Sequence, residues 1–158
     1  MRRQKTAKTA AVAALTMGLA ALATVGTAGT ASAAPVTINA ARSTSIHLEN
    51  RTGCDLYRTN QSLDHGIWTV EVPQIVRDGS RRDWASESNG FMTGTEGRAT
   101  FQTGNCGNPA LNYKEIELHW DNPYVGSNQY SERGDEFLFV REGGSGNNAD
   151  VTWRIWGR

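Results

Sequence analysis

Short runs of alternating apolar and polar residues follow one another along the chain from about residue 46 to residue 156. In the clearest run, Ile116, Leu118 and Trp120 alternate with Glu117 and His119. A period of two residues predicts a strand that buries one face and exposes the other to water. Comparable runs lie at 46–49, 54–58, 67–70, 82–88, 99–101, 137–141 and 151–156.

Segments rich in Gly, Asn, Asp and Pro separate these runs and predict turns. The main ones lie at 78–79, 88–90, 104–108, 121–128 and 143–148. About eight short strands joined by such turns, with no stretch of helical period, predict an all-β domain built as an antiparallel β-sandwich. A closed β-barrel is the alternative that the same pattern allows.

The first 33 residues have the three parts of a bacterial-type secretory signal peptide. Four Lys and Arg residues lie between positions 2 and 8, an apolar stretch spans about 10–25, and Ala-Ser-Ala at 31–33 suits signal peptidase. The apolar stretch falls short of the roughly 20 residues that cross a bilayer, which disfavours a membrane anchor. We therefore expect a signal peptide over 1–33, a flexible leader over 34–43 and one secreted domain over 44–158.

Charge and cysteine content narrow the class of protein further. Four of the 16 basic residues lie in the signal segment, so the remainder has four more acidic than basic residues. This acidic balance lacks the basic surface that binds phosphate backbones, and we expect no nucleic-acid partner. Both cysteines, Cys54 and Cys106, lie in the secreted part, where an even number predicts a disulfide.

Residue patterns typical of enzymes and of metal sites are missing from the sequence. There is no G-x-S-x-G nucleophile motif, and the three histidines, His47, His65 and His119, are scattered. Two cysteines and these histidines have no ligand spacing for a metal. We expect neither catalysis nor a metal or other cofactor.

The aromatic residues fall into two groups. Trp84, Trp120 and Trp153 lie within strand runs, where we expect them in the core. Trp68, Tyr124 and Tyr130 lie in or beside predicted loops, where an aromatic ring suits a membrane interface or a sugar. Two loops stand out: 86–97, with Phe91-Met92 between glycines, and 119–128, with Tyr124-Val125 as a predicted apolar tip.

These two loops carry a family resemblance. A T-G-T-E-G turn at 93–97, an I-x-L-x-W-D-x-P-aromatic segment at 116–124 and G-S-N at 126–128 resemble the aegerolysins. The resemblance implies a small β-sandwich that binds lipid membranes, notably sphingolipid-containing ones, in several cases with a larger perforin-type partner. It places the turn motif on Gly94, Thr95, Glu96 and Gly97. The membrane or ligand candidates, from the motif and the loops together, are Trp68, Phe91, Met92, Trp120, Asp121, Pro123, Tyr124 and Tyr130.

The sequence thus favours a secreted lipid-membrane-binding protein, which would serve as the recognition component of a two-component cytolysin and self-associate on the membrane. Two other hypotheses remain open. Aromatic residues beside Asp and Asn also suit a carbohydrate-binding module. A secreted interaction protein without a small ligand is the third, and it predicts that the loop aromatics are buried.

Overall fold

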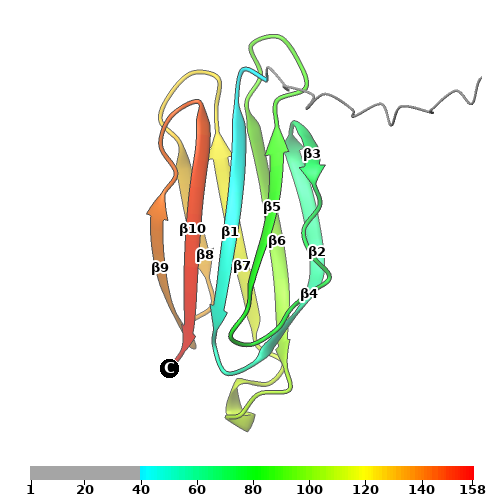
Figure 1. Cartoon of the computed structure of the whole chain (residues 1–158), viewed down its shortest axis with the longest axis vertical. Coiled ribbons are helices and arrows are strands. Elements are labelled where there is room, and N and C mark those ends of the chain that lie inside the picture. Colours follow the sequence, from blue (N-terminus) through cyan, green and yellow to red (C-terminus); the bar gives the residue numbers. More distant parts are fainter. Residues whose placement is uncertain (1–39) are drawn as a thin grey trace, which may run out of the picture. The chain divides into compact units, whose positions relative to one another are not determined.

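The computed structural model describes residues 40–158, and the predicted signal peptide with most of the leader lies outside these described residues. Within residues 40–158, ten strands form two stacked five-stranded sheets (Figure 1). One sheet has the order β3-β5-β1-β10-β9 and the other β4-β2-β6-β7-β8. The strands are β1 (Ser43–Arg51), β2 (Asp55–His65), β3 (Ile67–Val70), β4 (Ile75–Val76), β5 (Arg81–Glu87), β6 (Thr95–Gly104), β7 (Glu115–Asn122), β8 (Gln129–Arg133), β9 (Phe137–Gly143) and β10 (Asn148–Gly157), with a 3₁₀ turn η1 (Pro109–Leu111) before β7.

The β-sandwich prediction is confirmed. Among the described strands no ladder joins the two sheets, so the molecule is not a closed barrel. Each of the eight predicted runs lies in a strand, to within one residue at its ends, and β4 and β8 were not predicted. β4 has only two residues, and β8 is an edge strand with polar residues at four of its five positions, which leaves little hydrophobic alternation to detect.

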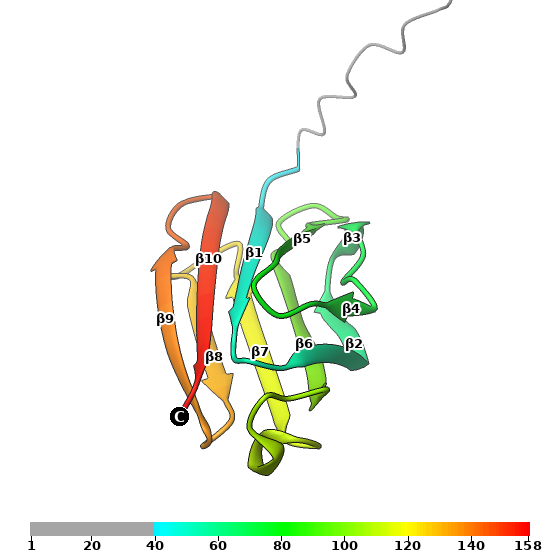
Figure 2. The ribbon, with the colours of Figure 1, turned by 60° about the horizontal axis from the view of Figure 1, so that its bottom comes forward.

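Among the described strands, every pairing but one is antiparallel. β1 pairs in parallel with β10 along its whole length, from Ser43 opposite Asn148 to Arg51 opposite Trp156. Both β1 and β10 lie in the interior of their sheet, although they are the first and last of the described strands (Figure 2).

The alternating apolar residues meet between the sheets. Ile46 and Leu48 of β1 and Ile116 and Leu118 of β7 are fully buried, as their period of two predicts. The expected core tryptophans, Trp84, Trp120 and Trp153, are also buried to 1% exposure or less. Alternation therefore identified the packed faces of both sheets correctly.

The predicted disulfide is present between Cys54 and Cys106. It joins the turn before β2 to the segment after β6, just beyond the point where Asp55 pairs with Gly104. Within residues 40–158, no helix combines the length and apolar character needed to span a bilayer.

Candidate functional site

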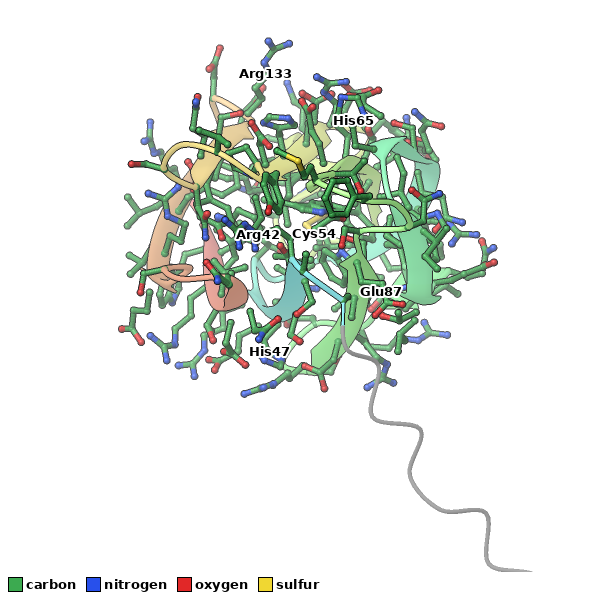
Figure 3. The ribbon with its side chains drawn as sticks, turned by 90° about the horizontal axis from the view of Figure 1, so that it is seen from above. Arg42, His47, Cys54, His65, Glu87 and Arg133 are labelled. Carbon is green, nitrogen blue, oxygen red and sulfur yellow. A yellow bond between two sulfur atoms is a disulfide. The ribbon has the colours of Figure 1, made fainter. Side chains whose placement is uncertain are left out.

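Four connections gather at one end of the sandwich, which we call the loop end. They are the β2–β3 turn at Gly66, the β5–β6 loop 88–94, the β7–β8 loop 123–128 and the β9–β10 loop 144–147 (Figures 1 and 3). β1 also begins here, so residues 40–42 reach the same end. The opposite end carries Cys54–Cys106 and η1, and we call it the disulfide end.

The loop end exposes three apolar side chains on two loops. Phe91 is 90% exposed and Met92 is 53% exposed in the β5–β6 loop, and Val125 is 80% exposed in the β7–β8 loop. Apolar side chains grouped on loop tips are more informative than isolated surface ones, because soluble domains rarely gather them without a partner. The three residues form the apolar tips of the loop end.

The β5–β6 loop is shaped by one hydroxyl. Thr93 Oγ1 accepts a hydrogen bond from Gly90 N at 3.1 Å and donates to Gly90 O at 3.0 Å, which closes the turn. Phe91 and Met92 lie between these two residues and project outward. Met92 has a left-handed backbone with φ 56°, an uncommon conformation for a residue of this size that often marks a functional site.

The β7–β8 loop is held by Arg42. Its Nε donates to Pro123 O at 2.9 Å, a second guanidinium nitrogen donates to Tyr124 O, and its guanidinium carbon lies 5.2 Å from the centre of the Tyr124 ring. Arg42 thus fixes the backbone that presents Val125. It has no carboxylate partner among the described residues, and no acidic residue precedes Glu49 in the chain.

This contact corrects one boundary. The leader was predicted to extend flexibly to Ser43, but Ser43 begins β1 and Arg42 is bound to the β7–β8 loop. Arg42 was missed as a site residue because its partners are backbone carbonyls about 80 residues away. The only signal in the sequence was an arginine without nearby acidic residues.

The two loops with apolar tips touch each other at Gly94. A Cβ at this position would lie 2.5 Å from Asn122 O and 2.8 Å from Pro123 Cα, so only glycine permits this approach. Beside this contact lies a shallow cleft of about 340 Å³, whose lining includes Met92 and Tyr124. The lining combines these side chains with polar and charged ones.

His65, Glu96 and Asp121 are the ionisable side chains that line this cleft, and His119 lies next to Glu96 outside the lining. Glu96 on β6 lies directly across from Asp121 on β7, and Glu96 Oε1 lies 3.0 Å from His119 Nε2. Burial, and then the charge of Glu96, raise the pKa of Asp121, whereas His119 and His65 act in the opposite direction. Among residues 40–158, no group of three or more His, Cys, Asp or Glu side chains is arranged to hold a metal ion.

Both tryptophan candidates are packed inward. Trp120 is fully buried and its Nε1 donates to Ser86 Oγ at 3.0 Å, so its ring cannot contact a ligand and that prediction is wrong. Trp68 lies in edge strand β3, half-buried, with its ring 5.7 Å from that of Trp120 in an edge-to-face arrangement. Trp68 is the one residue of β3 that is not exposed, and its ring packs against the core.

Tyr130 lies just beyond the β7–β8 loop, as expected, at the second position of β8. Its ring packs edge-to-face on Trp153 at 5.8 Å, and its hydroxyl donates to Gly144 O at 2.9 Å. Burial raises its pKa, although Asn128 and Arg141 act against that shift. Tyr130 therefore supports the β9–β10 loop from below.

The remaining predicted residues lie at the loop end. Phe91 and Met92 form apolar tips, while Asp121, Pro123 and Tyr124 are partly exposed around the cleft. Of the predicted turn motif, only Gly94 lies in a loop. Thr95, Glu96 and Gly97 belong to β6 and pair with Asn122, Asp121 and Trp120, so their assignment to a turn is wrong.

A solved structure has a similar β-sandwich fold. The crystal structure of the lipid binding protein Nakanori matches with a TM-score of 0.60 and 14% sequence identity, over 74% of this chain and 71% of that chain. At this identity the likeness concerns the fold alone.

Sequence similarity to known proteins is limited to one short segment among the matches found. No protein-family model matches the chain, and so the aegerolysin resemblance stays a prediction. An uncharacterised protein of Dictyostelium discoideum is 36% identical over 62 residues, which is 39% of this chain. The matched segment spans only 6% of that relative.

Proposed function

We propose that this protein is secreted and binds lipid membranes through its loop end, acting by binding rather than by catalysis. The observation that carries the proposal is the exposure of Phe91, Met92 and Val125 on two touching loops. A membrane interface would remove these side chains from water while the ordered strands beneath stay folded.

The size of the expected effect is modest. Burial of one such side chain contributes roughly 1.5–3 kcal/mol, from which the cost of immobilising the protein must be subtracted. A single copy would therefore bind weakly, and self-association on the membrane would strengthen attachment through avidity.

Two further facts support the proposal. Nakanori, a lipid binding protein, shares the fold. The Arg42 guanidinium, bound to carbonyl groups rather than to a carboxylate, leaves a positive charge beside the apolar tips. Cationic groups next to apolar insertion residues are favourable at bilayer surfaces.

We extend the proposal to the aegerolysin-like role of recognition component in a two-component cytolysin with a perforin-type partner. Weak attachment by apolar tips suits a protein that recruits another to the membrane. The protein alone is then expected to bind dye-filled vesicles without releasing the dye. Leakage caused by the protein alone would contradict the need for a partner.

Membrane binding is tested by co-sedimentation with vesicles of phosphatidylcholine, of sphingomyelin with cholesterol, and of anionic phospholipid. Phe91→Ser and Met92→Asn should each weaken binding to the preferred vesicle about 10- to 100-fold, the factor that corresponds to losing one buried apolar side chain. Folded wild-type protein that binds none of these vesicles would overturn the proposal.

Tyr113→Asn is the matched control for Met92→Asn. Tyr113 is also an exposed, bulky residue with positive φ, at 64°, but it lies at the disulfide end. Asn tolerates this backbone conformation at both positions. Equal losses of vesicle binding in the two variants would show that the loop end has no special role.

A further inference from the structure

A broad, open hollow lies at the disulfide end, away from the apolar tips. It has a volume of about 780 Å³ and is bounded by the start of β7, the end of β8, the start of β9 and Arg158. Its lining includes Tyr113 and the charged side chains of Glu115, Glu132, Arg133, Asp135 and Glu136. No step of membrane binding uses this hollow.

Tyr113 presents an unusually accessible aromatic ring on this hollow. The residue is 80% exposed, and its backbone has φ 64°. Exposing an aromatic ring and holding a non-glycine residue in the left-handed region are both unfavourable, and neither is needed for packing in the core. Strain of this kind tends to persist where a side chain must be held for a ligand.

Thr103 of β6 holds the backbone around Tyr113. Tyr113 N donates to Thr103 O at 2.9 Å, and Lys114 N donates to Thr103 Oγ1 at 2.9 Å. The same hydroxyl donates to Leu111 O, and Thr103 N donates to Lys114 O at 2.9 Å. The segment on both sides of Tyr113 is thus tied to a central strand.

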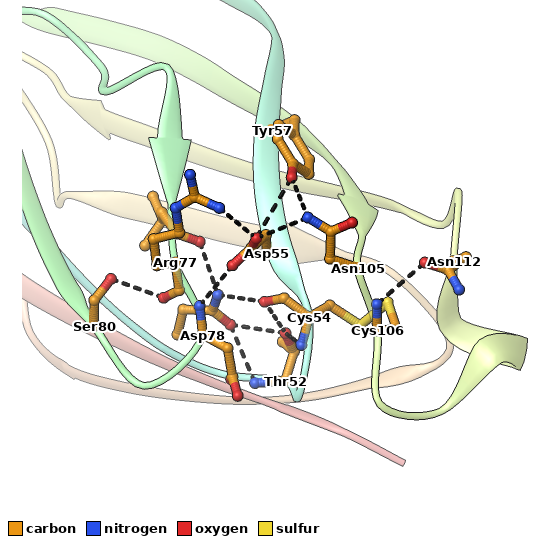
Figure 4. Close-up of polar contacts among 12 residues, drawn as sticks. Thr52, Cys54, Asp55, Tyr57, Arg77, Asp78, Ser80, Asn105, Cys106 and Asn112 are labelled. Atoms are coloured by element: carbon orange, nitrogen blue, oxygen red, sulfur yellow. Dashed lines mark hydrogen bonds and ion pairs between the residues drawn. A yellow bond between two sulfur atoms is a disulfide. The ribbon is translucent and has the colours of Figure 1, made fainter.

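The disulfide adds a second anchor. Cys106 N donates to Asn112 Oδ1 at 3.2 Å, which connects the residue before Tyr113 to the Cys54–Cys106 bridge (Figure 4). The bridge is surrounded by a polar network in which Asp55 accepts from Arg77 and Asn105. The ring of Tyr113 is therefore presented by a rigid base, which lowers the entropic cost of binding.

The charges around the hollow select among ligands. Lys114 pairs with Glu136 at 2.6 Å, and Arg158 donates to Asp135 O at 3.2 Å. Arg133, whose Nε lies 3.7 Å from Glu117 Oε1, is the third basic residue of the lining. Four acidic residues share that lining, so it has one more acidic than basic residue. A purely apolar ligand would remove these polar groups from water without offering them hydrogen bonds. An anionic ligand would be repelled by the excess carboxylate.

We propose that this hollow binds an oligosaccharide of neutral or amino sugars, with the apolar face of one sugar ring stacked on Tyr113. An aromatic ring beside carboxylates and guanidinium groups offers both the flat apolar surface and the hydrogen-bond partners that a sugar requires. The site is independent of membrane binding. The protein would thereby attach to a lipid surface at one end and to a glycan at the other.

An array of immobilised neutral, amino-sugar, sialylated and sulfated glycans tests the site. Wild-type protein should bind members of the first two groups, and Tyr113→Asn should weaken that binding at least tenfold. Tyr113→Phe keeps the ring and should retain most of the binding, while Met92→Asn should leave it unchanged. Absence of binding to every neutral and amino-sugar glycan would overturn the proposal.

Nuclear magnetic resonance of the wild-type protein locates the contact without relying on variants. Addition of a soluble array-positive oligosaccharide should shift signals of residues 113–115 and 132–136. Shifts confined to the loop end, or equal glycan binding by wild type and Tyr113→Asn, would also refute the assignment. Neither result depends on whether vesicles are bound.

Discussion

His47 lies between two carboxylates on the outer face of its sheet. Its Nδ1 is 2.6 Å from Asp83 Oδ1 on β5, and its Nε2 is 3.0 Å from Asp150 Oδ2 on β10. Burial lowers the pKa of His47, but the hydrogen bonds to Asp150 and Asp83 outweigh it and the net pKa is raised, with Arg81 acting weakly against the shift. Only the protonated ring can donate to both carboxylates at once.

The free energy of unfolding should therefore depend on pH through His47. A raised pKa means that the stabilisation is complete below the unfolded value of about 6.5 and is lost as the pH rises through the folded value. Because both carboxylates are largely exposed, solvent screening limits the effect to less than about 1 kcal/mol. Chemical denaturation across this pH range should show the decrease in wild type and not in His47→Gln. An identical slope in both proteins would contradict this role.

At the level of elements, Gly97 near the start of β6 is explained by the close packing of neighbouring strands and not by a turn. A Cβ on Gly97 would lie 2.6 Å from Leu63 Cδ2, 2.7 Å from Ser62 O and 2.7 Å from Trp120 Cζ2. Glycine here lets β2, β6 and β7 pack tightly around the buried indole. This part of the T-G-T-E-G motif thus has a structural explanation that is independent of any ligand.

Gly97→Ala should accordingly destabilise the domain by about 1–3 kcal/mol, as overpacking in a core does. Gly107→Ala is the matched control, because its Cβ would have its nearest neighbour at 3.9 Å. That variant should stay within about 0.5 kcal/mol of wild type. Urea denaturation measures both, and equal stability of the two variants would disprove the steric explanation.

For the molecule as a whole, the disulfide closes a long loop at the end remote from the apolar tips. Cys54 and Cys106 are 52 residues apart, and the bridge continues the β2–β6 ladder beyond Asp55. Asn50, fully buried nearby, donates to Cys54 O at 2.7 Å and to Val76 O at 2.9 Å. Covalent and polar contacts together make this end rigid.

Cys54→Ala/Cys106→Ala should lower the free energy of unfolding by about 4 kcal/mol in the chain-entropy model. Thermal and urea denaturation measure this loss. In conditions where the variant stays folded, glycan binding should weaken, because Asn112 and Tyr113 depend on the Cys106 segment. Vesicle binding should be unchanged, and a parallel loss of both activities would contradict the separation of the two ends.

The sequence alone determined the class of fold, the core tryptophans and the disulfide. These features depend on local alternation, as in 116–120, or on a simple count of cysteines, and neither requires knowledge of which strands become neighbours. The apolar tip residues Phe91 and Met92 were also found from local sequence, because they lie between glycines in a segment without strand alternation.

Only the tertiary structure decided which aromatic rings are accessible. Trp68 and Tyr130 pack against Trp120 and Trp153, whereas Tyr113 is exposed. It also brought Arg42 to the loop that follows β7, across 81 residues of chain. The physical reason is that the burial of a side chain and the hydrogen bonds of a loop depend on neighbours that are distant in sequence. The local pattern of residues does not identify those neighbours.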